Sequence, residues 1–483
     1  MELHILHTND VHSELERFSY LAKHLRARYD ELRDREQPVL CFELGDHIDM
    51  SNPLSYATAG HVNARILQTL PYDGWVFGNN ETLTIDQSEW AHLIRLANVP
   101  LFCSNLTVPG LNQDEQGNLV HGQYYEIDGV KIGVFGVTVK YEKSFATLGI
   151  KAEDPVAVAF QMASEMREHG AEIVILLSHL GYHMDQLLAD QGLPVDVIIG
   201  AHTHHFLDGG DLRSGIWILQ AGKHAYAFGH AVLHVDENHH VTNVTSSLEY
   251  TDFTGDPDEK VETAITSLHD KAIEWLQSPV ATISVPLSHS LFGESQLVNL
   301  LCDELRIELS AQLAFLNGGV ITAGYLAGTI RQKDLLAICG TPMRPVKMNV
   351  PGHALLQLIN EGNQEQLIRR QGYGFGFRGH FVGRLHVSGA HVTIAEMDSR
   401  ESGETATIVR VLIGMQQLDP MRMYTVVTSE YIALSPMYKS LHGYEYVYCE
   451  PLIRTFLGRA LGNGHLVEGA HKQRYRWIND DAN

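Results

Sequence analysis

Short apolar runs alternate with helix-like segments through the N-terminal half of the chain, and this alternation constrains the fold more than any other feature. Strand-like runs such as Val39–Glu43 are bounded by polar turns, whereas the stretch Val156–His169 has helical character. Strands that alternate with helices form a layered α/β domain with the strands at its centre. We therefore predict strands at Leu3–His7, Val39–Glu43, Trp75–Phe77, Lys131–Thr138, Ile173–Ser178 and Val195–Ile199.

Beyond Ile216 the pattern changes to adjacent strand-like runs. They predict an antiparallel sheet that closes the domain and forms a second sheet layer. The runs are Ile216–Leu219, Ala225–Val235 and Val241–Leu248.

A helix is predicted to start at Asp256-Pro257-Asp258-Glu259, which combines a capping carboxylate, a proline at the first helical position and a glutamate at the third. Its apolar residues form one stripe suited to packing between domains. A chain of 483 residues also exceeds what one hydrophobic core usually organises. We expect a catalytic domain over 1–255, an interdomain helix over 256–278 and a substrate-binding domain over 279–483.

The chain is acidic, with 58 acidic and 35 basic residues and a formal net charge of -23. Such a charge repels phosphate backbones and anionic membranes, so neither nucleic-acid polymers nor membranes are expected partners. A small anionic substrate remains compatible, because bound divalent cations would dominate the local field. The first residues run straight into a predicted strand, and the five cysteines are scattered without a paired motif. We expect no secretion signal and a cytoplasmic location.

Five predicted strands are followed by side chains that bind cations. Each piece alone has an ordinary explanation: an Asp-x-His sequence is usually a surface turn, and a histidine-rich stretch such as His202–His205 is often a solvated loop. Their joint occurrence after successive strands favours one metal site at the strand ends, where ligands of α/β sheets bind. A carboxylate such as Asp46 can bridge two cations. The candidate ligands are Asp10, His12, Asp46, Asn79, His179, His202 and His204.

These residues stand in sequence motifs that resemble those of the calcineurin-like metallophosphoesterases, and more narrowly of the 5′-nucleotidase and UDP-sugar hydrolase family. The motifs are His7-Thr8-Asn9-Asp10-Val11-His12, Leu44-Gly45-Asp46, Gly78-Asn79, Leu177-Ser178-His179 and Gly200-Ala201-His202-Thr203-His204. The resemblance implies a four-layer αββα metallophosphoesterase domain followed by a smaller α+β domain of the 5′-nucleotidase C-terminal type.

The resemblance also implies two divalent cations, of manganese, zinc, cobalt or iron. Asp10, His12, Asp46 and His204 would hold the first, and Asp46, Asn79, His179 and His202 the second. A hydroxide shared by the two cations would attack phosphorus in line. The implied substrates are nucleotides or nucleotide sugars, with an activity of the 5′-nucleotidase, UDP-sugar hydrolase or 2′,3′-cyclic nucleotide phosphodiesterase type.

The chain departs from the family at the catalytic acid. The family has a histidine after the ligand asparagine and an aspartate three positions later, where this chain has Asn80 and Leu83. Asn80 can donate a hydrogen bond but cannot protonate a leaving group. The rate of hydrolysis should therefore fall more for nucleoside monophosphates than for pyrophosphate linkages or activated diesters. Asp46 and Asn80 are the expected catalytic residues, and His47, His183 and His205 are candidates for a substitute proton donor.

In the C-terminal half, Leu316-Asn317-Gly318-Gly319 resembles the family's turn near its nucleotide pocket, although Thr322 replaces an arginine that often follows. The family clamps a base between two aromatic rings. Tyr431 stands near one such position, and the stretch Gly372–Gly379 offers a second ring and an anion contact, with core packing or a flexible hairpin as the alternative explanations. The expected substrate-binding residues are Asn317, Gly318, Phe375, Phe377, Arg378 and Tyr431.

Two other functions stay open beside hydrolysis. The loss of the acid at Asn80 and Leu83 is compatible with a catalytically weakened nucleotide or metal sensor. A purely structural metal site fits less well, because thiolate ligands are absent and a bridging carboxylate suits an open centre. No serine-hydrolase elbow, Walker A loop or catalytic cysteine signature occurs in the sequence.

Overall fold

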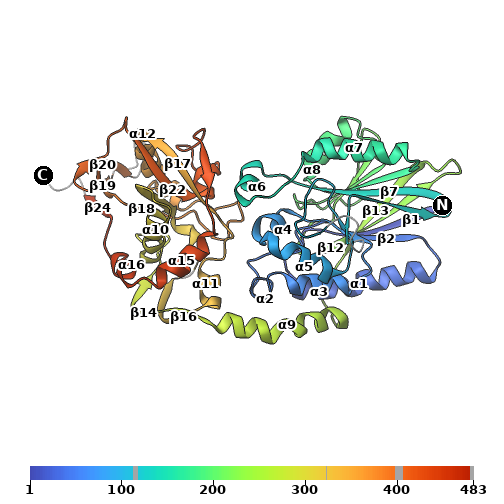
Figure 1. Ribbon diagram of the computed structural model, residues 1–483, viewed down its shortest axis with the longest axis horizontal. Coiled ribbons are helices and arrows are strands. Elements are labelled where there is room, and N and C mark those ends of the chain that lie inside the picture. Colours follow the sequence, from blue (N-terminus) through green and yellow to red (C-terminus); the bar gives the residue numbers. More distant parts are fainter. Residues whose placement is uncertain (112–117, 323, 397–405, 479–483) are drawn as a thin grey trace. The chain divides into compact units, whose positions relative to one another are not determined.

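The computed structural model describes residues 1–111, 118–322, 324–396 and 406–478. The chain divides into two compact units, Met1–Ile273 and Glu274–Asn483, each with its own buried core (Figure 1). Among the described residues, no helix is long and apolar enough to cross a membrane.

The N-terminal unit contains two sheets. The first has seven strands in the order β13-β12-β1-β2-β3-β4-β5, and the second has six in the order β10-β11-β9-β8-β7-β6. The strands of the first sheet are β1 (Glu2–Thr8), β2 (Val39–Glu43), β3 (Gly74–Trp75), β4 (Leu101–Phe102), β5 (Leu119–Val120), β12 (Ala227–Val235) and β13 (Val241–Tyr250). Those of the second are β6 (Gly122–Ile127), β7 (Val130–Thr138), β8 (Ile173–His179), β9 (Val197–Gly200), β10 (Asp211–Arg213) and β11 (Ile216–Leu219).

The two sheets pack face to face, and helices cover both outer faces (Figure 1). Apolar side chains such as Ile5 and Phe42 of the first sheet meet Ile132 and Ile175 of the second in one buried cluster. Helices α7 (Pro155–Glu168) and α8 (Tyr182–Asp190) cover the second sheet, and α1 (Leu15–Asp34), α3 (His61–Gln68) and α5 (Gln87–Ala97) cover the first. The expected four-layer αββα architecture is confirmed.

Every predicted strand overlaps an observed strand, although Trp75–Phe77 overlaps β3 only at Trp75, and one pairing was predicted wrongly. Ile216–Leu219 does not join the antiparallel hairpin of β12 and β13. As β11 it pairs in parallel with β9 in the second sheet, while β12 pairs antiparallel with β1 in the first. The chain therefore crosses from one sheet to the other between Leu219 and Ala227, which nearness in sequence could not reveal.

The helix expected from Asp256 onward is α9 (Glu259–Gln277), which begins three residues later than predicted, so Pro257 precedes the helix and Asp258 takes the capping position given to Asp256. The Asp258 carboxylate accepts hydrogen bonds from the backbone N–H groups of Lys260 and Val261 at its first turn. Val261 and Ala264 pack into the core of the N-terminal unit.

The C-terminal unit mixes sheets with helices that pack around one core. A five-stranded sheet has the order β18-β15-β22-β17-β23, a four-stranded sheet the order β21-β20-β19-β24, and β14 pairs with β16. The strands are β14 (Pro279–Ser288), β15 (Leu313–Asn317), β16 (Tyr325–Arg331), β17 (Pro345–Pro351), β18 (Leu385–Ser388), β19 (His391–Glu396), β20 (Ala406–Ile413), β21 (Gln416–Gln417), β22 (Met423–Ser429), β23 (Tyr446–Tyr448) and β24 (Tyr475–Ile478). The longest helices are α10 (Gln296–Glu308), α12 (Gly352–Glu361) and α15 (Ile453–Leu461).

Candidate metal centre

The seven candidate ligands meet at the carboxyl ends of strands from both sheets of the N-terminal unit. In the first sheet, Asp10 and His12 follow β1, Asp46 follows β2, and Asn79 opens the short helix α4 (Asn79–Thr84) after β3. In the second sheet, His179 is the last residue of β8, and His202 and His204 follow β9. Parallel neighbours such as β1 with β2 and β8 with β9 end on the same side, which is why residues far apart in sequence converge.

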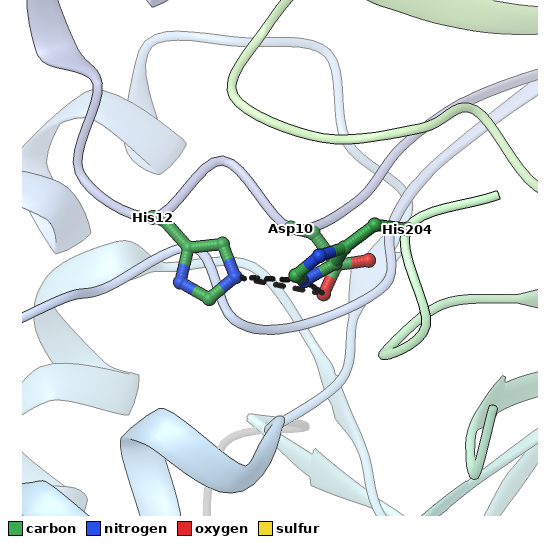
Figure 2. A group of neighbouring side chains, drawn as sticks. All are labelled: Asp10, His12 and His204. Carbon is green, nitrogen blue, oxygen red and sulfur yellow. Dashed lines mark hydrogen bonds and ion pairs between the residues drawn. The ribbon is translucent and has the colours of Figure 1, made fainter. Parts of the chain in front are cut away.

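Asp10, His12 and His204 form one ligand group (Figure 2). His12 Nε2 lies 3.2 Å from His204 Nε2, and Asp10 Oδ1 lies 3.9 Å from the first and 3.5 Å from the second. The Asp10 carboxylate is fully buried, and the facing nitrogens of both rings point at it.

Asp46, His179 and His202 form the second group. His179 Nε2 lies 3.5 Å from Asp46 Oδ1, while Asp46 Oδ2 lies 3.8 Å from His12 Nε2 of the first group. Asp46 thus faces both groups, one oxygen toward each.

Two details of the second group fit a cation. The amide oxygen of Asn79 lies 2.7 Å from His202 Nδ1 and 3.2 Å from Asp46 Oδ2, so three atoms able to ligate a metal come together. His179 Nε2 is buried and has no hydrogen-bond partner among the described residues. Carboxylate, imidazole and amide oxygen are donors that divalent transition metals accept, so the residues present fit such an ion.

The loops of the site hold unusual backbone conformations. Asp10, His12, Asp46, His202 and His204 all have positive φ, between 50° and 73°, a region that side-chain-bearing residues seldom occupy. Strained backbone of this kind persists where surrounding structure fixes it, and it concentrates at functional sites.

A buried glutamate, Glu81, joins the loops after β2 and β3. Its carboxylate accepts the backbone N–H groups of Asp46 at 3.0 Å, Ile48 at 2.8 Å and Gly78 at 2.8 Å. Burial, reinforced by the charge of Asp46, raises the pKa of Glu81 to about 7. The glutamate therefore fixes the position of the Asp46 backbone.

The far nitrogen of His12 has two polar neighbours. His12 Nδ1 lies 3.4 Å from Asp49 Oδ2 and 3.0 Å from Asn80 Nδ2. Burial lowers the pKa of His12, but the hydrogen bond with Asp49 and the charges of Asp46 and Asp10 outweigh it and raise this pKa. A carboxylate behind a ligand histidine fixes the ring orientation and its tautomer.

His179 and Asp46 are electrostatically paired. Burial alone would lower the pKa of His179, but the Asp46 carboxylate raises it to about 9. For Asp46, burial acts in the opposite sense, and His179 together with His12 holds its pKa well below the usual range. The His179 ring also contacts the carbonyl oxygen of Leu44 through Nδ1 at 2.6 Å, which directs Nε2 at Asp46.

The three histidines considered as substitute proton donors differ in placement. His47 is fully buried against Phe18, neither of its ring nitrogens has a hydrogen-bond partner among the described residues, and burial lowers its pKa to about 3. His183 is exposed on α8, and His205 is exposed with Nδ1 3.0 Å from Thr203 Oγ1. The ring contacts of His12 and His204 at the site involve none of these three.

Sequence reasoning missed the loop that joins β11 to β12. Gln220 is buried there, donates to the carbonyl of Ala201 and accepts the N–H of His205, so it supports the loop of His202 and His204. His224 lies against His12 and His204. Burial, followed by the positive charges of His12, Lys223, His204 and Arg17, lowers the pKa of His224 to about 4. If Ile216–Leu219 had been predicted to pair in parallel with its neighbour, Gln220 and His224 would have been candidate site residues, because they follow the end of that strand.

In the C-terminal unit, Asn317 ends β15 and donates to the carbonyl of Val382, and Gly318 follows it. The Phe377 ring packs on Tyr431 with 4.5 Å between centroids and 19° between planes, so these two rings leave no slot for a base between them. Phe377 is 9% exposed and Tyr431 0%, which makes them core side chains, whereas Phe375 is 39% exposed. The backbone N–H of Arg378 donates to Thr341 Oγ1.

Comparison with known proteins gives consistent results. Residues 3–206 match the calcineurin-like phosphoesterase family model, and residues 279–436 match that of the 5′-nucleotidase C-terminal domain. The uncharacterized metallophosphoesterase YunD of Bacillus subtilis is 28% identical over 439 residues, which span 90% of this chain and 94% of that protein. A snake venom 5′-nucleotidase from Crotalus adamanteus is 24% identical over 426 residues, 78% of this chain and 71% of that protein.

Solved structures agree with the sequence matches. The NAD nucleotidase of Haemophilus influenzae superposes with a TM-score of 0.66 at 16% identity, with 99% of each chain covered. A 5′-nucleotidase precursor from Thermus thermophilus superposes with a TM-score of 0.57 at 20% identity, with 99% of this chain and 100% of that chain covered. At such identities these superpositions establish the fold.

Proposed function

Because the chain belongs to the calcineurin-like phosphoesterases and carries a 5′-nucleotidase C-terminal domain, we propose that it hydrolyses phosphate esters of nucleotides in a metal-dependent reaction. The observation that carries the proposal is the convergence of two ligand groups on the Asp46 carboxylate. In this proposal Asp10, His12, Asp46 and His204 hold one divalent cation, and Asp46, Asn79, His179 and His202 hold the second.

The two cations would supply the Lewis acidity that activates water and offsets negative charge on the phosphoryl oxygens. The chain's own residues orient the centre. His179 Nδ1 lies 2.6 Å from the Leu44 carbonyl oxygen, so in the metal-bound form the Nδ1–H would donate to that carbonyl and leave the lone pair of Nε2 for the cation. The backbone N–H of Asn80 donates to Asp46 Oδ1 at 2.7 Å and fixes the plane of the shared carboxylate.

The substrate preference follows from Asn80. Its side-chain amide contacts His12 Nδ1 and carries no titratable proton, so a departing oxygen receives at most a hydrogen bond from it. General acids contribute roughly 10²- to 10⁴-fold, and an ester with a poor leaving group depends on them most. We therefore place pyrophosphate linkages and activated diesters ahead of nucleoside monophosphates as substrates. The exposed Phe375 is the proposed aromatic contact for the base.

A substrate panel tests this function. The metal-free protein would be reloaded with manganese, zinc or cobalt and tried on an aryl phosphodiester, UDP-glucose, a 2′,3′-cyclic nucleotide and AMP, with Asp46→Asn as the inactive control. We expect metal-dependent turnover of the first three to exceed that of AMP by about 10²-fold or more. Tight nucleotide binding without turnover of any substrate would instead favour the sensor function, which the loss of the acid at Asn80 motivates.

A further inference from the structure

The loop that crosses between the two sheets carries one more imidazole to the metal centre. The ring of His224 meets the His12 ring edge to face, with 5.6 Å between centroids and 85° between planes. Its centroid lies 6.5 Å from that of His204. His224 is therefore a direct neighbour of two of the three residues in the Asp10 group.

The position of His224 is fixed by hydrogen bonds to the ligand loops. Its backbone N–H donates to the carbonyl oxygen of Asp10 at 2.8 Å. Asn9, next to Asp10, donates to the carbonyl of Gly222 at 2.7 Å and accepts the N–H of Ala221 at 2.9 Å, and the N–H of Gly222 donates to the carbonyl of His205. The loop thus keeps one geometry relative to both Asp10 and His204.

The backbone at His224 is strained, and its side chain keeps free hydrogen-bonding capacity. His224 and Ala225 both have φ of 56°, two consecutive side-chain-bearing residues in the left-handed region. No hydrogen bond to another described residue engages either ring nitrogen, and the ring is only half-buried. Strain of this kind at a site is a reason to look for function.

Two basic residues, Lys223 and Arg17, stand near the loop of His224. Lys223 precedes His224 in the chain, and the charges of Lys223 and Arg17 contribute less than burial to the lowered pKa of His224. The Arg17 guanidinium lies 4.6 Å from the ring centroid of Tyr226 and 3.7 Å from Glu14, with which it forms an exposed ion pair. Arg17 is thus paired with an acidic side chain, and Lys223 is the cation next to His224 in the chain.

We propose that His224 forms a phosphate-binding subsite beside Asp10, His12 and His204, in which the imidazole N–H of His224 donates to a phosphate oxygen. This inference rests on the proposed function and deepens it, because it assigns a substrate contact to a residue of the phosphoesterase domain. The ligand class is a phosphate ester or inorganic phosphate.

Binding of inorganic phosphate to the metal-loaded full-length protein, measured by calorimetry, tests the subsite. A hydrogen bond to a charged group accounts for about a tenfold change in affinity or more, so His224→Phe should weaken phosphate binding about 10-fold with the metal content unchanged. His224→Gln retains an N–H donor and should lose less. The matched control is His234→Phe at the far end of β12, a partly exposed histidine that contacts Glu2 and Thr245, and it should bind phosphate as the parent does.

Three results would overturn the subsite: no phosphate binding by the metal-loaded parent protein, unchanged affinity in His224→Phe, or a loss of metal in both His224 variants. The last result would mean that the residue supports the ligands instead. If the parent turns over no substrate on the panel, the proposed function fails, yet the phosphate affinities still decide the role of His224. If His224→Phe does not fold, His224→Ala, which also lacks a side-chain donor, takes its place with the same expected loss of phosphate affinity.

Discussion

Two glycines at the candidate metal centre, Gly45 and Gly78, allow the loops after β2 and β3 to approach each other closely. Gly78 has an ordinary φ of −89°, but a Cβ there would lie 2.2 Å from Asp46 Oδ1 and 2.6 Å from the His179 ring. Gly45 adds a φ of 91° and a Cβ position 2.6 Å from the backbone nitrogen of Gly78. These glycines allow the loops after β2 and β3 to contact each other. This steric requirement explains the glycine in both the Leu-Gly-Asp and the Gly-Asn motif.

Gly78→Ala should therefore displace Asp46 and reduce metal binding at both ligand groups. We expect the bound metal per chain to fall below two and the free energy of unfolding to fall by about 1 to 3 kcal/mol, the usual cost of overpacking. Gly464→Ala is a suitable control, since nothing lies within 4 Å of that Cβ position. Metal titration and chemical denaturation measure the two effects, and full metal content in Gly78→Ala would contradict the expectation.

Asp49 offers a test of how His12 is held. Asp49→Asn keeps an acceptor for the N–H of Ser51, which now donates to Asp49 Oδ1, but it removes the carboxylate behind His12 Nδ1. Loss of such a partner typically lowers metal affinity about 10- to 100-fold. Competition with a metal chelator measures this change, with Asp236→Asn in a remote turn as the control. An unchanged affinity would mean that Asn80 alone suffices to orient the ring.

Among the elements, strands that are buried apolar runs, such as β8, were predictable, whereas the two-residue strands β4 and β5 and the more exposed strands β6 and β10 were not. A helix near Asp256 was predictable, but the carboxylate that caps it belongs to Asp258. The strand that pairs with β11 could not be predicted from the sequence. The apolar sequence of Ile216–Leu219 would suit a strand of either sheet. Only its parallel pairing with β9 places its carboxyl end beside the candidate ligands. The seven candidate ligands could be picked out in the sequence because they stand at or just after the ends of strands, whereas His224 was missed because Ile216–Leu219 was paired wrongly. The stacking of Phe377 on Tyr431 depends on tertiary packing and left no sequence signal.

One element of the C-terminal unit is expected to be acid-sensitive. His386 in β18 is fully buried, its Nε2 accepts the N–H of Ser295 at the start of α10, and its Nδ1 faces the Arg384 carbonyl at 3.0 Å. Burial lowers its pKa to about 3. Since the folded pKa lies below the unfolded value of about 6.5, the stability from neutral His386 is complete above that pH and is lost as the pH falls toward 3.

Urea denaturation of the full chain at pH 7.5, 5.5 and 4.5 checks this dependence. The unfolding free energy of the unit that contains β18 should fall over this range, with a limiting slope of about 1.4 kcal/mol per pH unit from this one group. His386→Gln should be less stable at pH 7.5 but show a shallower decline, whereas His391→Gln, at an exposed position of β19, should follow the parent. Equal slopes for His386→Gln and the parent would exclude His386 as the source.

At the scale of the whole molecule, the two units should respond differently to metal, because all seven proposed ligands belong to Met1–Ile273. A ligand that binds only the folded state stabilises it by about 2.7 kcal/mol at a hundred times its dissociation constant. Chelation should therefore lower the melting temperature of the N-terminal transition and leave that of the C-terminal transition unchanged. Calorimetric scans with and without chelator measure both, and a shift confined to the C-terminal transition would refute the ligand assignment.

The origin of the ligands in two sheets has a consequence for how the N-terminal unit matures. Asp10, Asp46 and Asn79 follow strands of the first sheet, whereas His179, His202 and His204 lie at or just after the ends of β8 and β9 in the second. A cation bound by residues of both sets would therefore link the two sheets. Neither sheet alone carries a complete set. Complete metal binding would then require that the two sheets have already packed together. A folding intermediate in which they are still apart would not bind the cations, even at high metal concentration.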